Sequence, residues 1–180
     1  MARPGCNAAA ASFLLAGLCG CLAVRHDAPD ELLRLAPQSE ARYHCGPSTL
    51  ASVLCYHGAA VPEVRIAEAI YSPTARGVLL TDLAWYAREQ GFQAEAEQGT
   101  RQDLQQAIDL GRPPIVLLDL GLGPLRRPHF TALTGFGPRG VFFIGTSSEV
   151  DYAPDHLFER QWKRAGNQLL VIRPPSSAPP

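Results

Sequence analysis

Hydrophobic and polar positions follow a helical period over several stretches of this chain. Between residues 46 and 57, apolar side chains recur at three- and four-residue spacing, which predicts a helix. Pro47 suits the first turn of this helix, and Gly58 suits the position after its end, where a left-handed backbone is favoured. Similar patterns predict further helices at residues 61–71, 80–91, 100–111 and 155–166.

Two of these helices carry end signals. Thr81 is a candidate N-cap of the helix at 80–91, and Gly91 is a candidate stop. Thr100 with Asp103 three residues later resembles a capping box, with Asp in place of the usual Glu, and Gly111 ends that pattern. The sequence therefore predicts well-defined ends for these two helices.

The second half of the chain changes to a strand-like pattern. A short strand is predicted at 92–97, and four more runs of apolar or alternating residues follow at 114–120, 129–136, 140–146 and 167–172. A Gly-Pro-Arg-Gly turn separates two of these runs, which is consistent with an antiparallel sheet. Helices first and a sheet afterwards predict an α+β fold.

The N-terminus has the pattern of a secretory signal. Residues 1–20 contain one Arg, a small and apolar stretch from 8 to 18 and then small residues, and the apolar stretch is too short for a membrane-spanning helix. "LCGC" resembles a bacterial lipobox, in which Cys21 is acylated and Cys19 is the alternative. We expect a signal peptide at 1–20, a lipid-anchored tether at 21–36, one domain at 37–173 and a disordered tail at 174–180. The mature protein would be periplasmic and anchored to a membrane by its lipid.

Composition removes several classes of function. The 180 residues carry 16 Lys and Arg against 17 Asp and Glu, so no excess of positive charge favours a nucleic acid as partner. Cys55 and His57 form one potential ligand pair without a second pair at zinc-like spacing, and the "GLG" at 121–123 lacks the rest of a nucleotide-binding motif. We expect no metal and no cofactor.

Two cysteines, Cys45 and Cys55, remain once the signal peptide and the lipidated cysteine are set aside. They lie ten positions apart in one predicted helix, about 15 Å at helical rise, which is beyond the reach of a disulfide. We therefore expect two free thiols. Cys45 falls at the helix N-terminus, where free N–H groups and the helix dipole stabilise a thiolate, whereas Cys55 reads as a small buried side chain.

Two stretches resemble the motifs of one known family. "YHCGPSTLASVLCYHG" resembles the nucleophile segment of the papain-like fold, in particular of the double-glycine (bacteriocin-leader) peptidases and their stand-alone relatives in the bacterial envelope. Their signature is a Gln and then Cys-Gly-Pro or Cys-Gly-Ala, which opens a helix. "RRPHFTALTGFG" resembles the family's second motif, a His that opens a strand. The likeness covers about residues 37–174 and implies a papain-like fold, with N-terminal helices packed on an antiparallel sheet.

The resemblance also implies a set of catalytic residues. Cys45 matches the nucleophile, His129 the general base, and Gln38 the glutamine of the oxyanion hole, although Gln38 lies a residue or two further from the cysteine than is usual. The chemistry fits, because a thiolate attacks the carbonyl carbon while an imidazole takes and returns the proton. The backbone N–H of Cys45 would be the second oxyanion donor.

The residue that orients the histidine departs from the family. Leader peptidases carry Asp-Pro about seventeen residues after the His, where this chain has Thr146 and Ser147. A hydroxyl accepts from the imidazole but stabilises its charged form less than a carboxylate does. Asp119 is an alternative, because a hairpin between 114–120 and 129–136 would set Asp119 opposite His129 across its mouth.

Arg126 and Arg127 precede the histidine in the loop between these two strands. They are candidates to hold a substrate carboxylate or to lower the pKa of His129 by like-charge repulsion, and solvation is the alternative for both.

We therefore expect a periplasmic cysteine peptidase that acts on a peptide or protein of the bacterial cell envelope. An NlpC-type cell-wall amidase or endopeptidase is one alternative, and a non-catalytic lipoprotein that binds a partner in its cleft is another. The altered orienting position, Thr146 or Ser147, is compatible with both alternatives.

Overall fold

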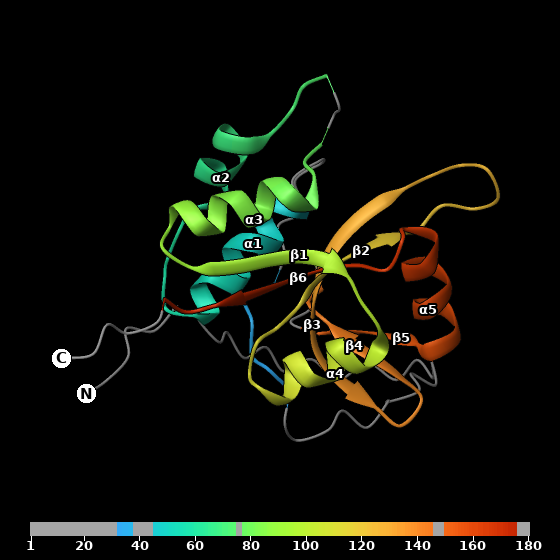
Figure 1. The fold of residues 1–180 in the computed structure, drawn as a ribbon. Coiled ribbons are helices and arrows are strands. Elements are labelled where there is room, and N and C mark those ends of the chain that lie inside the picture. Colours follow the sequence, from blue (N-terminus) through green and yellow to red (C-terminus); the bar gives the residue numbers. More distant parts are fainter. Residues whose placement is uncertain (1–31, 38–44, 75–76, 146–149, 176–180) are drawn as a thin grey trace, which may run out of the picture.

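The computed structural model describes residues 32–37, 45–74, 77–145 and 150–175. Its centre is a six-stranded antiparallel sheet with the order β1-β6-β2-β3-β4-β5 (Figure 1). The strands are β1 (Gln93–Gln98), β2 (Ile115–Asp119), β3 (Pro128–Gly137), β4 (Gly140–Phe143), β5 (Asp151–Pro154) and β6 (Gln168–Arg173). The expected antiparallel sheet is confirmed, with β5 as an additional edge strand. β5 has four residues and ends in proline, so its sequence carries little strand signal.

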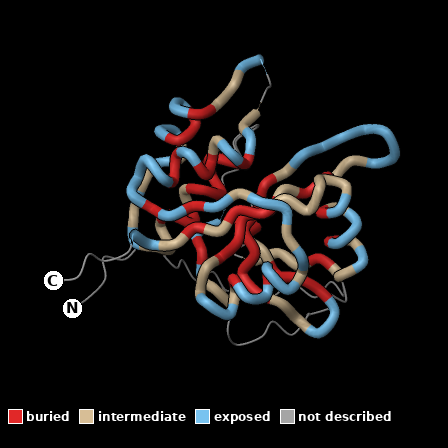
Figure 2. Tube along the Cα trace, in the orientation of Figure 1, coloured by how far each residue is buried: buried red, intermediate tan, exposed pale blue. Residues whose placement is uncertain are grey.

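Helices cover both faces of the sheet. They are α1 (Cys45–Tyr56), α2 (Glu63–Ile70), α3 (Leu80–Glu89), α4 (Arg101–Asp109) and α5 (Asp155–Arg164). The first three contribute to one apolar cluster with one face of the sheet, and α4 and α5 contribute to a second cluster on the other face. Buried segments therefore run along the sheet and the inward sides of the helices (Figure 2). No helix within the described ranges is long and apolar enough to cross a membrane.

The helix ends follow local chemistry. Thr100 caps α4 as expected, because its hydroxyl accepts from the Asp103 N–H while the Asp103 carboxylate accepts from the Thr100 N–H at 2.7 Å. The expected cap of α3 at Thr81 is wrong. The N-cap is Leu79, two residues earlier, and the Asp82 carboxylate accepts from the N–H of Leu79 at 2.8 Å.

The segment before the first helix is part of the domain. Leu35 is buried in the cluster under α1, and the N–H of Leu33 donates to the carbonyl of Thr134 in β3 at 2.8 Å. The expected tether at 21–36 is therefore wrong for residues 32–36, because their leucines pack against the sheet. The expected signal peptide, the lipidated Cys21 and the end of the tail, residues 176–180, lie outside the described residues.

Candidate active site

Cys45 is the first residue of α1 and the one free cysteine among the described residues. Its side chain is half-buried and packs against the cluster under α1. The first N–H groups of a helix have no partner inside the helix, so the start of α1 offers donors to an oxygen that gains negative charge. The predicted helix at 46–57 and the place of the cysteine at its start are thus confirmed.

The start of α1 is joined to β3 by a buried hydroxyl. Thr49 Oγ1 donates to the carbonyl of Cys45 at 2.6 Å and to the carbonyl of Phe130 at 3.2 Å. A hydroxyl has one proton, so the two carbonyls share it. Thr49 thereby couples the turn that carries the nucleophile to the residue next to His129. Sequence reasoning missed this role, although a fully buried Thr one turn after the cysteine, in a helix interior, is a usable signal.

Close packing between α1 and β3 requires a glycine after the nucleophile. A Cβ atom added to Gly46 would overlap Cγ2 of Val78 and would lie 3.2 Å from Cδ2 of Phe130. The absence of a side chain at this position lets the helix start approach the strand that carries His129.

His129 is the second residue of β3 and lies directly opposite Leu118 of β2. Burial lowers the pKa of His129, and the charge of Arg127 lowers it further, so the imidazole is neutral near pH 7 and able to accept a proton. Cys45 and His129 both lie in the described ranges, and no hydrogen bond joins the thiol to the imidazole ring there. Such catalytic contacts are often long in the absence of substrate.

Asp119 does not face His129, so the expectation that it orients the imidazole is wrong. The register pairs Asp119 with Pro128, one residue away from the expected pairing, and adjacent residues of a strand point to opposite faces. The buried Asp119 carboxylate instead accepts from the N–H groups of Gly121 at 2.9 Å and Arg127 at 3.0 Å. The N–H of Arg127 is the main cause that lowers the pKa of Asp119 to about 2, and contacts with Gly121 and Arg164 add to it.

The same carboxylate binds two arginines. Arg126 Nη1 lies 3.0 Å and Arg164 Nη2 lies 3.2 Å from Asp119 Oδ2, and Arg164 also donates to the carbonyl of Gly123 at 3.0 Å. These contacts fasten the loop of residues 120–127 to the end of α5. Nothing in the sequence pointed to Arg164, because it lies 45 positions from Asp119.

Three expected site residues lie outside the described residues: Gln38, Thr146 and Ser147. Their expected roles in the oxyanion hole and in orienting the histidine stay predictions. In the described ranges, no group of three His, Cys, Asp or Glu side chains gathers that could hold a metal ion.

Cys55 differs from expectation. It is disulfide-bonded and half-buried, not a free and buried thiol, and its partner lies outside the described residues. The argument from helix length excluded only a bond to Cys45, which is indeed free.

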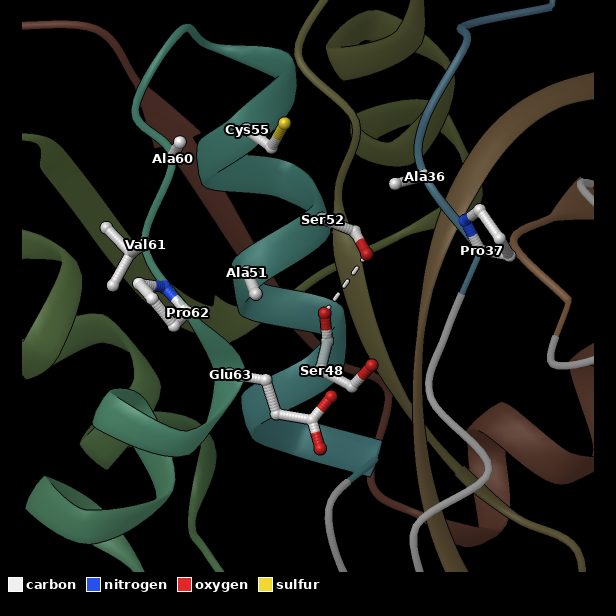
Figure 3. A pocket seen from close by; sticks show the side chains of 10 residues that line it. All are labelled: Ala36, Pro37, Ser48, Ala51, Ser52, Cys55, Ala60, Val61, Pro62 and Glu63. Atoms are coloured by element: carbon white, nitrogen blue, oxygen red, sulfur yellow. Dashed lines mark hydrogen bonds between the residues drawn. The ribbon is translucent and has the colours of Figure 1, made fainter. Parts of the chain in front are cut away.

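A pocket of 440 Å³ lies beside α1, between this helix, the segment of residues 36–37 and the connection to α2 (Figure 3). Ser48, Ser52 and Cys55 line it from α1, and Ser52 donates to the carbonyl of Ser48 at 3.1 Å. Their spacing puts them on the side of α1 that also carries Cys45. Cys45 itself is not among the described residues that line the pocket, which therefore runs along the helix away from the nucleophile.

The fold, with a free cysteine at the start of a helix and a histidine at the start of a strand in an antiparallel sheet, is that of the papain-like cysteine peptidases. The family model of the Peptidase C39 family matches residues 36–176. The chain therefore belongs to the Peptidase C39 family and is a cysteine-type peptidase. The expected fold class is confirmed.

Solved structures agree with this assignment of the fold. The peptidase domain of Streptococcus ComA, a bi-functional ABC transporter involved in quorum sensing, shares 22% identity over 79% of this chain and 98% of its own, with a TM-score of 0.62. A double-glycine-motif protease from an AMS/PCAT transporter, in complex with the leader peptide, shares 18% identity over 81% of this chain and 95% of its own, with a TM-score of 0.64. A C39-like peptidase from Bacillus anthracis shares 17% identity over 82% of this chain and 100% of its own, with a TM-score of 0.66. No curated protein matches the chain.

Proposed function

We propose that this chain hydrolyses peptide bonds by a thiolate mechanism that passes through a thioester. Cys45 attacks the carbonyl carbon, while His129 takes the thiol proton and then gives it to the leaving amine. Water, activated by the same imidazole, releases the acyl group. The observation that carries this proposal is the position of the free Cys45 at the start of a helix that Thr49 bonds to the strand of His129.

Two further roles complete the mechanism. The N–H of Cys45 and the side-chain amide of Gln38 are the proposed donors to the tetrahedral oxyanion. Thr146 or Ser147 is the proposed acceptor for the second imidazole nitrogen. Asp119 is not a candidate, because its carboxylate is occupied by Gly121, Arg127 and two other arginines.

The proposed substrate is a peptide or protein in the bacterial cell envelope, and the proposed location is the periplasmic side of a membrane, with the lipid on Cys21. The signal-like N-terminus supports this location. The disulfide at Cys55 supports the periplasmic side but not the lipid, because disulfides persist in oxidising compartments. One related protease, that of the AMS/PCAT transporter, is in complex with a leader peptide, which supports a peptide substrate here.

A lipid on Cys21 and a disulfide between Cys21 and Cys55 exclude each other in the mature chain. A mature chain that begins at Cys21 keeps only Cys21, Cys45 and Cys55. An acylated Cys21 then leaves no partner for Cys55, because Cys45 is free and the thioether to the lipid uses the sulfur of Cys21. Mass spectrometry of the mature protein, before and after reduction, distinguishes the acylated protein from the disulfide-bonded protein. A diacylglyceryl mass on Cys21 supports the anchor, whereas an unacylated N-terminus downstream of Cys21 contradicts it.

The test of the catalytic pair is the rate of iodoacetamide alkylation of Cys45 as a function of pH, followed on the modified peptide by mass spectrometry. We expect wild type to react faster than His129→Ala near neutral pH, because the imidazole takes the proton of the thiol and the thiolate is the nucleophile. His156→Ala, which changes an exposed histidine on α5, is the matched control and should behave as wild type. Equal alkylation rates in all three proteins at every pH contradict the mechanism.

The residues outside the described ranges are tested by peptide hydrolysis. Gln38→Ala should lower kcat by about a hundredfold, as the loss of one oxyanion donor does elsewhere. Of Thr146→Ala and Ser147→Ala, the variant that removes the orienting hydroxyl should lower kcat and shift the acid limb of the pH profile, while the other leaves both unchanged.

A further inference from the structure

The backbone just before His129 is fixed by the end of β2. The N–H of Arg127 donates to Asp119, and the carbonyl of Arg127 accepts from the N–H of Leu120 at 2.9 Å. The bond between Leu120 and Arg127 continues the backbone pairing of β2 with β3 by one residue pair beyond Asp119 and Pro128. Arg127 therefore lies in the same extended ladder as His129, two residues before it. Since alternate residues of a strand share a face, the two side chains leave the strand on the same side, about 7 Å apart along it.

The two neighbouring arginines of this loop have different surroundings. Arg126 Nη1 donates to the Asp119 carboxylate and, at 2.5 Å, to the carbonyl of Arg164. It serves to hold the loop. The Arg127 side chain is exposed, and no ion pair or side-chain hydrogen bond engages its guanidinium in the described part of the chain. An unpaired cation thus stands beside the histidine, close enough to lower its pKa.

We propose that Arg127 binds a carboxylate of the substrate on the leaving-group side of the cleaved bond. This inference rests on the proposed function. His129 must deliver a proton to the leaving amine, so the leaving part of the peptide passes beside His129. An extended peptide advances about 3.3 Å per residue, so a carboxylate one or two residues after the cut comes within reach of Arg127.

The chemistry of the guanidinium supports a carboxylate as the ligand. Its planar N–H groups match both oxygens of a carboxylate. The backbone bonds of Arg127 to the Asp119 carboxylate and to the N–H of Leu120 fix the base of its side chain before substrate arrives. Two sources supply such a group: the side chain of Asp or Glu, or the C-terminal carboxylate of a short peptide. Both present the same chemistry to Arg127.

The experiment is digestion of a synthetic peptide library, prepared once with amidated C-termini and once with free acids, followed by identification of the cut sites by mass spectrometry. Wild type, Cys45→Ser, Arg127→Gln, Arg127→Glu and Arg139→Gln are compared. Arg139, an exposed arginine in the turn after β3, is the matched control. Melting temperatures confirm that each variant is folded.

We expect the Cys45-dependent cuts of wild type to be enriched in peptides with a carboxylate within two residues after the cut. Arg127→Gln should lower kcat/KM for these peptides about tenfold, mainly through KM, and Arg127→Glu should favour Lys or Arg at the same positions. Arg139→Gln should retain the wild-type preference. Enrichment of Asp and Glu in the amidated library identifies a side-chain carboxylate, and enrichment confined to free acids identifies the C-terminus.

Two outcomes overturn this inference in distinguishable ways. Cys45-dependent cuts without carboxylate enrichment, or with an enrichment that Arg127→Gln retains, overturn the role of Arg127 and leave the peptidase proposal intact. An absence of Cys45-dependent cuts in both libraries counts against the proposed function, and against this inference with it.

Discussion

The hydroxyl of Thr49 lies 3.2 Å from the carbonyl oxygen of Phe130, a residue 81 positions further along the chain. The same hydroxyl donates to the carbonyl of Cys45 at 2.6 Å, one helical turn earlier. Because Phe130 adjoins His129, this side chain links the helix of the nucleophile directly to the strand of the histidine.

Replacement of Thr49 by Val keeps the shape of the side chain and removes the hydroxyl. We expect Thr49→Val to slow pH-dependent alkylation of Cys45 and to destabilise the fold by about 1 kcal/mol, the contribution of a typical buried hydrogen bond. Thr49→Ser, which keeps the donor, should retain most of the wild-type alkylation rate. A Val variant that reacts as fast as wild type at every pH would show that the hydroxyl does not position the site.

Gly46→Ala should push α1 away from its neighbours, because the added Cβ overlaps Val78 and crowds Phe130. Overpacking of this kind costs about 1–3 kcal/mol, which urea unfolding measures. Val78→Ala removes the atom that is overlapped, so the double variant should recover part of this loss relative to Val78→Ala alone. Equal losses in the presence and absence of Val78 would contradict the clash.

Asp119 should stabilise the protein above its unfolded-state pKa. The pKa of its carboxyl is lowered from 3.8 to about 2 in the folded protein, so the unfolded chain binds more protons between these values. The contribution is complete above pH ~4 and is lost as the pH falls through about 2. Urea unfolding between pH 2 and 6 measures how the free energy of unfolding changes with pH. This free energy should rise with pH in wild type and rise less steeply in Asp119→Asn.

The matched control is Asp109→Asn, which changes an exposed carboxylate at the end of α4. This variant should keep the acid slope of wild type. Asp119→Ala should be less stable than Asp119→Asn at pH 7, because alanine leaves the N–H groups of Gly121 and Arg127 without their acceptor. An acid slope that survives in Asp119→Asn would assign it to other groups.

His57 should make the fold sensitive to mild acid. Burial is the main cause that lowers the pKa of His57, Arg112 adds to it, and a hydrogen bond to the backbone of Ile172 opposes it. Its Nε2 atom is buried and has no hydrogen-bond partner among the described residues, so protonation in the folded state is disfavoured. Since the unfolded chain binds the proton near pH 6.5, stability should fall as the pH drops below this value.

Thermal unfolding between pH 5 and 8 measures this effect. His57→Phe, which keeps a ring against Phe92 and removes the titrating group, should flatten the slope below pH 6.5. The pKa of His129 is also lowered, so His129→Ala measures how much this second histidine contributes to the dependence of stability on pH. An unchanged slope in His57→Phe would exclude His57 as its source.

The local pattern of the sequence was sufficient for the helices and most strands. Helical spacing predicted the segment at 46–57, and the capping box at Thr100 predicted the start of α4, because both depend on residues within one or two turns. The places of Cys45 and His129 at the starts of their elements followed from the same local signals. The cap of α3 was misplaced by two residues, because the Asp82 carboxylate bonds the N–H of Leu79 and the helix begins at Leu80.

Only the tertiary structure decided which side chains meet. Whether Asp119 faces His129 depends on a register of one residue in a hairpin, and a shift of one residue turns every side chain to the opposite face. In the described part of the chain, Arg126 is bonded and the Arg127 guanidinium is not. This difference depends on Arg164, which α5 brings to the loop from a distant part of the chain. Local spacing carries no information about such contacts, because they arise only when separate elements pack together.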